Sequence, residues 1–147
     1  RKKNYVMFEK NKWIKQKDIT IINKKEKNFV KIFKSYLNCK YKWGGKTHQG
    51  IDCSALVQIF YKFSNKFFPR DTVDQIKYKK GNIIKKKFKL GDIIFWKGHV
   101  AVCLNKRELI HAYGPRKKVL IMPIIKTIKL IEKTAKLKVI KIISIYF

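Results

Sequence analysis

The spacing of the apolar residues changes part-way along this chain, and that change restricts the folds it can adopt. Between residues 28 and 63 the apolar side chains recur at three- and four-residue intervals, which is the spacing of one buried helix face. After Gly81 they come in short alternating runs separated by turn residues, which is typical of strands. Helices followed by a run of antiparallel strands predict an α+β domain with helices packed on an antiparallel sheet.

The same patterns predict the individual elements. Two short strand-like pieces, 4–8 and 12–14, open the chain. No apolar run approaches the roughly 18 residues of a membrane span, so we expect no transmembrane segment. We expect helices over 28–37, 53–63 and 124–134, a short helix over 71–75, and strands over 93–96, 99–104, 108–112, 119–122 and 138–146.

Composition and charge limit the class of protein. The chain has 147 residues, of which 46% are hydrophobic, and this suits one compact domain plus a fragment of another. Its formal net charge is +28. The charge has two interpretations: attraction to a polyanion, or a lysine-rich composition that arose without selection for binding. The lysines are scattered and no nucleic-acid-binding motif is recognisable, so we expect no specific nucleic-acid partner.

Cys53 stands where the second helix is expected to begin. Asp52 is well placed to cap that helix, and the positive end of the helix dipole favours a thiolate. A neighbouring imidazolium would lower the pKa of the thiol further, so the position suits a cysteine nucleophile. Cys39 and Cys103 lie among apolar or helix-end residues, and we expect them to pack as small hydrophobic side chains.

Two histidines, His99 and His111, flank a predicted hairpin turn centred on Asn105. Residues opposite each other on adjacent strands have Cβ atoms roughly 4.5–5.5 Å apart. One imidazole could therefore accept the thiol proton while the other orients it. A register slip of one residue would send the rings to opposite faces. A zinc site of Cys53, His99 and His111 is the alternative, although its spacing matches no common structural zinc pattern. His48 is interpreted as a solvated loop residue.

Six motifs follow one another along the chain: Tyr41-x-Trp43-Gly44-Gly45, Gly50-Ile51-Asp52-Cys53-Ser54, Pro69-Arg70 followed by Gln75, Gly91-Asp92-Ile93-Ile94-Phe95-Trp96, Gly98-His99-Val100-Ala101-Val102 and Ile110-His111-Ala112. Taken together, these motifs resemble the NlpC family of bacterial cell-wall cysteine peptidases, which are papain-like in fold, and in particular its γ-D-glutamyl-diaminopimelate endopeptidase group. The resemblance covers residues 28–147, the predicted peptidase domain. The chain departs from the family pattern at Ala55, where glycine is usual, and at Cys103, where an aliphatic residue is common.

This resemblance implies a role for each site residue. Cys53 corresponds to the nucleophile, His99 to the general base and His111 to the residue that orients the base. Tyr41 corresponds to the family's loop tyrosine, whose hydroxyl would hold the oxyanion or the substrate. The backbone N–H of Cys53 would be a second oxyanion donor. No metal or organic cofactor is implied.

Two further assignments follow from the resemblance. Asp52 and Ser54 flank the nucleophile, and in related enzymes such residues contact the free amino end of the peptide; helix capping is an alternative role that is compatible with this one. Residues 1–20 resemble the end of the bacterial SH3-like β-barrel domain that often precedes the catalytic domain.

The implied activity is hydrolysis of the amide between γ-D-glutamate and the following diamino acid in peptidoglycan stem peptides. Two alternatives remain: a catalytically silent wall-binding module of the same fold, and a nucleic-acid-binding protein driven by charge. We expect a location in the bacterial cell envelope or periplasm, or in the cytoplasm if the enzyme recycles freed muropeptides. The sequence leaves open whether the diamino acid is diaminopimelate or lysine, and what the oligomeric state is.

Overall fold

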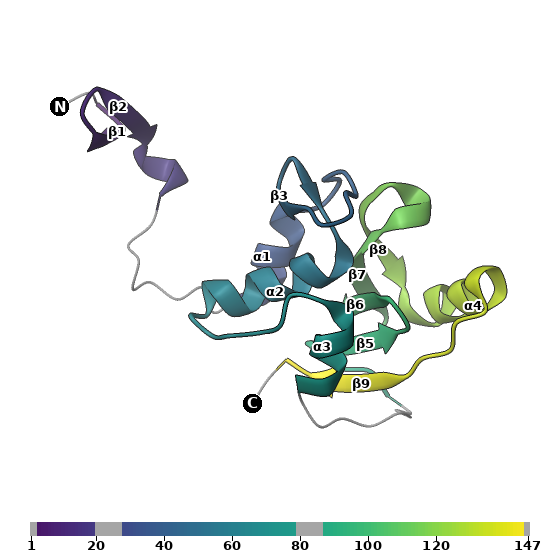
Figure 1. Cartoon of the computed structure of the whole chain (residues 1–147). Coiled ribbons are helices and arrows are strands. Elements are labelled where there is room, and N and C mark those ends of the chain that lie inside the picture. Colours follow the sequence, from purple (N-terminus) through teal and green to yellow (C-terminus); the bar gives the residue numbers. More distant parts are fainter. Residues whose placement is uncertain (1–2, 20–27, 79–86, 146–147) are drawn as a thin grey trace.

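The computed structural model describes residues 3–19, 28–78 and 87–145. Its centre is a five-stranded antiparallel sheet with the strand order β8-β7-β6-β5-β9 (Figure 1). The strands of this sheet are β5 (Asp92–Trp96), β6 (His99–Cys103), β7 (Glu108–Tyr113), β8 (Lys118–Pro123) and β9 (Lys141–Ser144). The helices are α1 (Phe29–Ser35), α2 (Cys53–Phe63), α3 (Thr72–Tyr78) and α4 (Ile124–Ala135). The predicted α+β architecture is confirmed.

Both faces of the sheet are covered. Val100 and Val102 of β6 belong to the core that α1 and α2 complete, whereas Ala101 and Cys103 belong to a second core completed by α4. This alternation is the period of two that a strand imposes on its side chains. The strands are therefore buried on both sides, which explains why they are almost continuously apolar in sequence.

The ends of several elements differ from the sequence prediction, most of all those of α1, α3 and β9. Helix α3 runs to Tyr78 rather than to residue 75. Helix α1 ends at Ser35 rather than residue 37, and the chain turns through Asn38, whose φ of 66° is left-handed. Strand β9 begins at Lys141 rather than residue 138, because Lys136 adopts φ 57° at the end of α4 and the chain needs the next residues to return to the sheet. Residue 146 of the predicted last strand lies outside the described residues.

The N-terminal segment forms the predicted pair of strands. Strand β1 (Tyr5–Glu9) pairs antiparallel with β2 (Lys12–Lys15), and a short 3₁₀ turn, Gln16–Asp18, follows. None of the described hairpin residues is buried, so the hairpin adds nothing to the two cores. Its assignment as the end of an SH3-like barrel stays a prediction. Within the described residues, no helix has the length and apolar character needed to cross a membrane.

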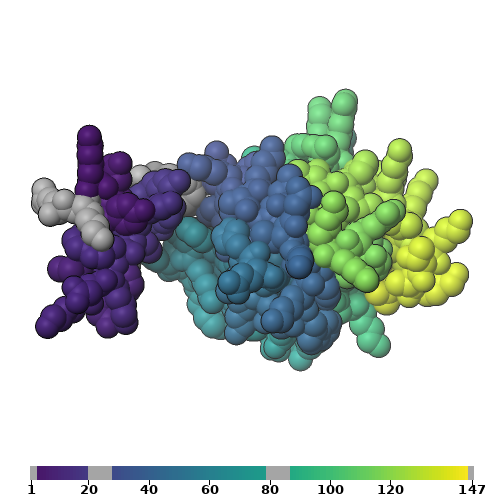
Figure 2. All heavy atoms as spheres, turned by 90° about the horizontal axis from the view of Figure 1, so that it is seen from above, coloured from purple at the N-terminus to yellow at the C-terminus, as the bar shows by residue number. Residues whose placement is uncertain are grey.

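The loop between α1 and α2 links the helices to the edge strand of the sheet. Asn38 N–H donates to the Val119 carbonyl and Val119 N–H donates to the Cys39 carbonyl, both at 2.9 Å. Tyr41 N–H donates to the Lys117 carbonyl at 2.8 Å. Two short strands, β3 (Lys46–Thr47) and β4 (Gly50–Ile51), close the loop. Seen from above, the blue surface of residues 28–50 borders the green surface of the later strands (Figure 2). Residues on either side of this border form the candidate site.

Candidate active site

Cys53 is the first residue of α2, as predicted. Its N-cap is Asp52, whose Oδ1 accepts a hydrogen bond from Ala55 N–H at 2.8 Å. The Cys53 side chain is buried but lines a pocket of about 210 Å³. The wall of that pocket includes Tyr41 and Gly98, and its other lining residues are Trp43, Gly44, Asp52, Ser54, Arg70, Asp71, Thr72 and Val73.

The environment of the Cys53 thiol raises its pKa, contrary to the sequence expectation. Burial is the largest cause, and the negative charge of Asp52 adds to it. Backbone N–H groups of Val100, Ser54 and Cys53 itself act in the opposite direction, because they stabilise the thiolate. The N–H groups at the helix N-terminus therefore act in the predicted direction, but burial outweighs all three donors, and the resting group is the neutral thiol.

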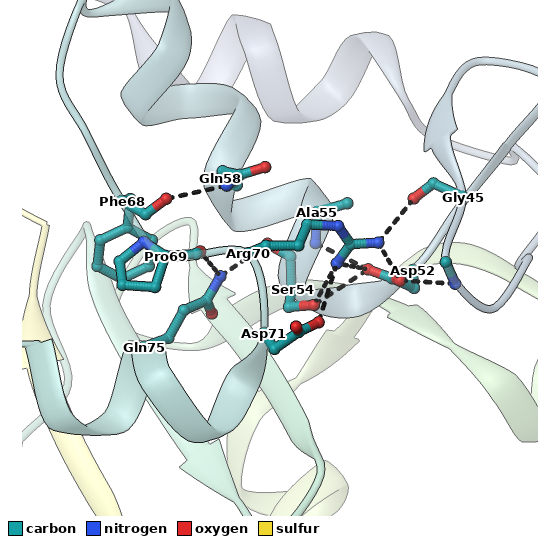
Figure 3. A network of polar contacts seen from close by, with 11 residues as sticks. Gly45, Asp52, Ser54, Ala55, Gln58, Phe68, Pro69, Arg70, Asp71 and Gln75 are labelled. Atoms are coloured by element: carbon teal, nitrogen blue, oxygen red, sulfur yellow. Dashed lines mark hydrogen bonds and ion pairs between the residues drawn. The ribbon is translucent and has the colours of Figure 1, made fainter.

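Arg70 holds Asp52 in place across the pocket (Figure 3). Its Nη1 donates to Oδ1 at 3.0 Å and its Nη2 donates to Oδ2 at 2.6 Å, which is a paired geometry that only arginine provides. Gly44 N–H donates to Oδ2 at 2.9 Å, and the Ser54 hydroxyl donates to Oδ1 at 3.1 Å. Together with the cap to Ala55, five donors converge on one carboxylate.

A second contact fixes the segment that carries Arg70. The buried Gln75, from α3, donates through Nε2 to the carbonyls of Ser54 at 3.0 Å and Pro69 at 2.9 Å. Figure 3 shows this amide reaching from α3 to the start of α2. Gln75 thus joins the arginine segment to the nucleophile helix.

Tyr41 reaches the site from the loop. A bridge between Tyr41 and Ile51 places the tyrosine alongside the residue that precedes Asp52. The ring lies against Gly114, where an added Cβ would be 3.5 Å from the ring carbons. Burial raises the pKa of the Tyr41 hydroxyl, and negative charge on Cys53 and Asp52 raises it further, so the hydroxyl lies within electrostatic reach of the sulfur.

His99 and His111 meet directly. Nε2 of His99 lies 2.9 Å from Nδ1 of His111. The predicted turn centre was wrong: Val102 pairs with Ile110, so the hairpin turns about Lys106 rather than Asn105. Moving the turn centre by one residue shifts the residue opposite each position by two. A shift of two preserves the alternation of side chains, so both imidazole rings stay on one face of the sheet. The histidines are therefore diagonal neighbours rather than directly opposite each other.

Both imidazoles are held neutral. Burial lowers the pKa of His99 from 6.5 to about 4. Burial, and then the charge of His99, lower the pKa of His111 to about 3. Aromatic rings surround the pair: the Tyr113 ring stacks on His111 with centroids 4.7 Å apart, and Trp96 lies 5.5 Å from His99. Neither imidazole therefore carries a charge in the resting protein, and each has a lone pair that can accept a proton.

The thiol and the histidine pair belong to adjoining hollows. A groove of about 430 Å³ has His99 in its wall and shares Tyr41 and Gly98 with the Cys53 pocket. Val100, whose backbone acts on the Cys53 thiol, is the residue after His99. The structure thus gathers Tyr41, Cys53, Asp52 and Ser54 around one pocket, and joins His99 to His111 beside it.

The other cysteines and His48 take the predicted places. All three cysteines are described and none forms a disulfide. Cys103 is fully buried and Cys39 packs at the edge of the core. His48 is exposed and stacks on Tyr36 with ring centroids 3.9 Å apart. Within the described ranges, no three His, Cys, Asp or Glu side chains form a group that could hold a metal ion, so the zinc alternative receives no support.

Comparison with known proteins places the chain. The profile of the NlpC/P60 family matches residues 38–134. The chain belongs to the NlpC/P60 family. Its described architecture is the papain-like α+β fold of that family, as expected. The NlpC/p60 domain of the peptidoglycan hydrolase SagA superimposes with a TM-score of 0.59 and 29% identity, over 67% of this chain and 88% of that domain.

Two curated relatives have named activities. Dipeptidyl-peptidase 6 of Lysinibacillus sphaericus is 34% identical over 85 residues, which are 58% of this chain and 31% of that protein. The γ-D-glutamyl-L-lysine dipeptidyl-peptidase of Bacillus subtilis is 31% identical over 101 residues, which are 63% of this chain and 34% of that protein. The chain therefore spans about a third of the length of these two relatives.

Arg70 and Gln75 were recognised in the sequence only as parts of a motif, with no role assigned. A signal was present: the chain has 37 lysines and arginines, and Arg70 is one of the few arginines among them. Where composition favours lysine so strongly, a retained arginine suggests a site that needs two parallel N–H donors. The partner could not be identified in this way, because Asp52 lies 18 residues away in the chain.

Proposed function

We propose that this NlpC/P60 domain is a cysteine hydrolase that cuts the amide between γ-D-glutamate and the following diamino acid in peptidoglycan stem peptides. Family membership supports the hydrolase class, and the name of the B. subtilis relative supports the bond. The observation that carries the proposal is the position of Cys53: it begins α2 and lies beside the strand that presents His99 bound to His111. A cell-envelope location would bring the enzyme to its substrate.

The proton path follows from the contacts of His99. Its Nε2 is engaged by His111, so Nδ1 is the nitrogen left for the Cys53 thiol. Nδ1 takes the thiol proton as sulfur attacks the carbonyl carbon. The imidazolium then returns the proton to the leaving amine, and a thioester remains on Cys53. Water, deprotonated by His99, releases the acyl product and restores the thiol.

The starting state is the neutral thiol with neutral imidazole. The pKa of Cys53 is raised and that of His99 is lowered to about 4, so the ion pair is not the resting form. Proton transfer must then accompany attack. The imidazolium that forms is a strong acid for the same reason, and this favours protonation of the amine. The Tyr41 hydroxyl and the Cys53 backbone N–H are the proposed donors to the oxyanion.

The pocket of Cys53 and the groove beside His99 would each bind one side of the scissile amide. The acyl side of the scissile amide would occupy the pocket of Cys53, and the amine side would leave through the groove beside His99, which must protonate it. Lys97 and Arg116 line that groove, so a leaving peptide with carboxylate groups suits its charge.

Defined muropeptides test the proposal directly. The purified chain is incubated with stem tri- and tetrapeptides that contain either diaminopimelate or lysine, and the products are read by mass spectrometry. We expect cleavage after γ-D-glutamate, and loss of cleavage by several orders of magnitude in Cys53→Ala and His99→Ala. Cys103→Ala, a change at a buried thiol on the other core, is the matched control.

Each alternative predicts a different result. A silent wall-binding module would bind muropeptides or intact wall without releasing any product, and Cys53→Ala would bind equally well. Cleavage at another amide by a Cys53-dependent reaction would retain the mechanism but overturn the proposed bond.

A further inference from the structure

Met122 contacts the far side of the histidine pair. Its Sδ lies 3.3 Å from Nε2 of His111, while Nδ1 of the same ring contacts His99. Met122 is on β8, opposite Leu109 in the ladder, and is thus a diagonal neighbour of His111. Both nitrogens of the buried His111 ring therefore have partners of known chemistry.

The sulfur determines where the proton of His111 lies. A thioether can accept a hydrogen bond but has none to donate. The contact is therefore favourable only when Nε2 of His111 carries the hydrogen. Because the pKa of His111 is lowered to about 3, the ring is neutral and has one hydrogen only. Nδ1 then presents a lone pair to His99.

The same logic extends to the next ring. If Nδ1 of His111 is an acceptor, Nε2 of His99 must donate to it across the 2.9 Å contact. A neutral His99 with hydrogen on Nε2 has its lone pair on Nδ1. This is the tautomer that can accept a proton from a thiol. If the hydrogen bond between the rings ran in the opposite direction, from His111 to His99, the hydrogen of His99 would lie on Nδ1. That nitrogen could then no longer act as a base.

We propose that Met122 is a positioning residue that sets the direction of the hydrogen-bond chain through His111, so that Nδ1 of His99 is the basic nitrogen. This inference rests on the proposed hydrolase function only for its effect on rate. The tautomers themselves are properties of the resting protein. Hydrogen bonds in a chain polarise one another, so an acceptor at the far end of the chain influences the hydrogen positions on both rings.

The chain allows a substitution of the sulfur alone. It has two methionines, Met7 and Met122, so in a Met7→Leu background the incorporation of norleucine for methionine replaces Sδ of Met122 by a methylene of similar shape. Nitrogen-15 NMR of labelled histidine then reports which ring nitrogen carries hydrogen. The methionine-containing Met7→Leu protein is the matched control, and Met7 lies in the exposed N-terminal hairpin.

We expect the control to show hydrogen on Nε2 in both rings, and the norleucine protein to show a mixture of tautomers. In the norleucine protein kcat should fall by about threefold to tenfold with unchanged KM, as for loss of one weak hydrogen bond. Its thermal midpoint should match that of the control.

Two results would overturn the inference: hydrogen on Nδ1 of His111 in the control, or identical tautomers and kcat in both proteins. These outcomes are separate from failure of the proposed function, which would appear as absence of hydrolysis in the control while the tautomer shift on norleucine incorporation still occurred.

Discussion

The Arg70 guanidinium donates to both oxygens of Asp52, at 3.0 Å from Nη1 to Oδ1 and 2.6 Å from Nη2 to Oδ2. The pair joins three parts of the site, because Asp52 also caps α2 and accepts from the N–H of Gly44 in the loop. Arg70 in turn donates to the Ser54 hydroxyl at 2.8 Å. The pair therefore sets the relation between the nucleophile helix and the loop that carries Tyr41.

Arg70→Met should destabilise the fold. Removal of the guanidinium leaves a mostly buried carboxylate without its counter-charge, and breaking such a pair costs about 3 kcal/mol of unfolding free energy. Urea denaturation followed by circular dichroism measures the loss. Lys62→Met, which removes an exposed cation from α2, should change stability by less than about 0.5 kcal/mol. Equal, small losses in both variants would show that the pair is not structural.

The two loop glycines should respond differently to alanine. A Cβ at Gly45 would lie far inside van der Waals contact with the Gly50 carbonyl, so the loop must open. At Gly44 the space is free, and only the left-handed φ of 74° opposes a side chain. We expect Gly45→Ala to lower kcat/KM at least about tenfold through displacement of the site. Gly44→Ala should cost about 1 kcal/mol of stability and retain most activity.

Steady-state kinetics and urea midpoints of the two variants distinguish these effects. A Gly45→Ala protein with wild-type activity and a wild-type urea midpoint would show that the close contact between Gly45 and the Gly50 carbonyl does not hold the site in place.

The sequence predicted what depends on neighbours in the chain. The start of α2 at Cys53 and its cap by Asp52 follow from adjacent residues, and both are confirmed. The face shared by His99 and His111 was also predicted, although the turn centre was wrong by one residue. Asn105 explains the error: its side chain accepts from the N–H groups of Arg107 and Glu108, which closes a longer loop than a turn centred on Asn105.

What depends on distant residues was not predicted. The dipole of α2 is local and favours the thiolate, whereas the burial that raises the Cys53 pKa comes from a sheet assembled later in the chain. Likewise, the contact between Met122 and His111 requires the register of β7 with β8, and no local pattern determines which residue of β8 meets the ring.

Acid should destabilise the protein through its histidine pair. The pKa of His99 falls from 6.5 to about 4 on folding, so between these pH values the folded chain binds fewer protons than the unfolded chain. The contribution of His99 to the free energy of unfolding is therefore fully present above pH 6.5. It is lost as the pH falls toward 4, and the loss reaches about 3 kcal/mol. Urea midpoints at about pH 7.5 and about pH 5 measure this loss.

The matched variants for this prediction are His99→Gln and His48→Gln. The first removes one buried imidazole of the pair and should reduce the dependence of stability on pH, while His111, whose pKa is also lowered by burial, keeps the remainder. The second removes the exposed imidazole of the loop and should keep the wild-type slope. A wild-type slope in His99→Gln would mean that the acid sensitivity arises elsewhere.

Alkylation of Cys53 should follow the raised pKa of its thiol. Burial holds the group protonated above its ordinary value of 9.0, so the rate of reaction with iodoacetamide should still rise with pH through that value. A Cys39→Ser, Cys103→Ala variant leaves Cys53 as the single thiol, and its urea-unfolded form supplies the reference curve. A rate that levels off in the acid range would instead indicate a resting thiolate–imidazolium pair.

Recognition of a free amino terminus should depend on Asp71 rather than on Asp52. An ionised carboxylate offers about four lone-pair sites, and those of Asp52 are taken by five donors within the protein. Asp71 lines the same pocket, and its carboxylate is largely exposed.

Asp71→Asn should therefore raise KM by about twofold to fivefold for stem peptides with a free L-alanine amine, as loss of one exposed ion pair would. KM for the N-acetylated peptides should not change. Asp52→Asn should instead lower the urea midpoint and reduce cleavage of both substrates alike, and a selective effect of that variant on the free-amine peptide would assign the amine to Asp52.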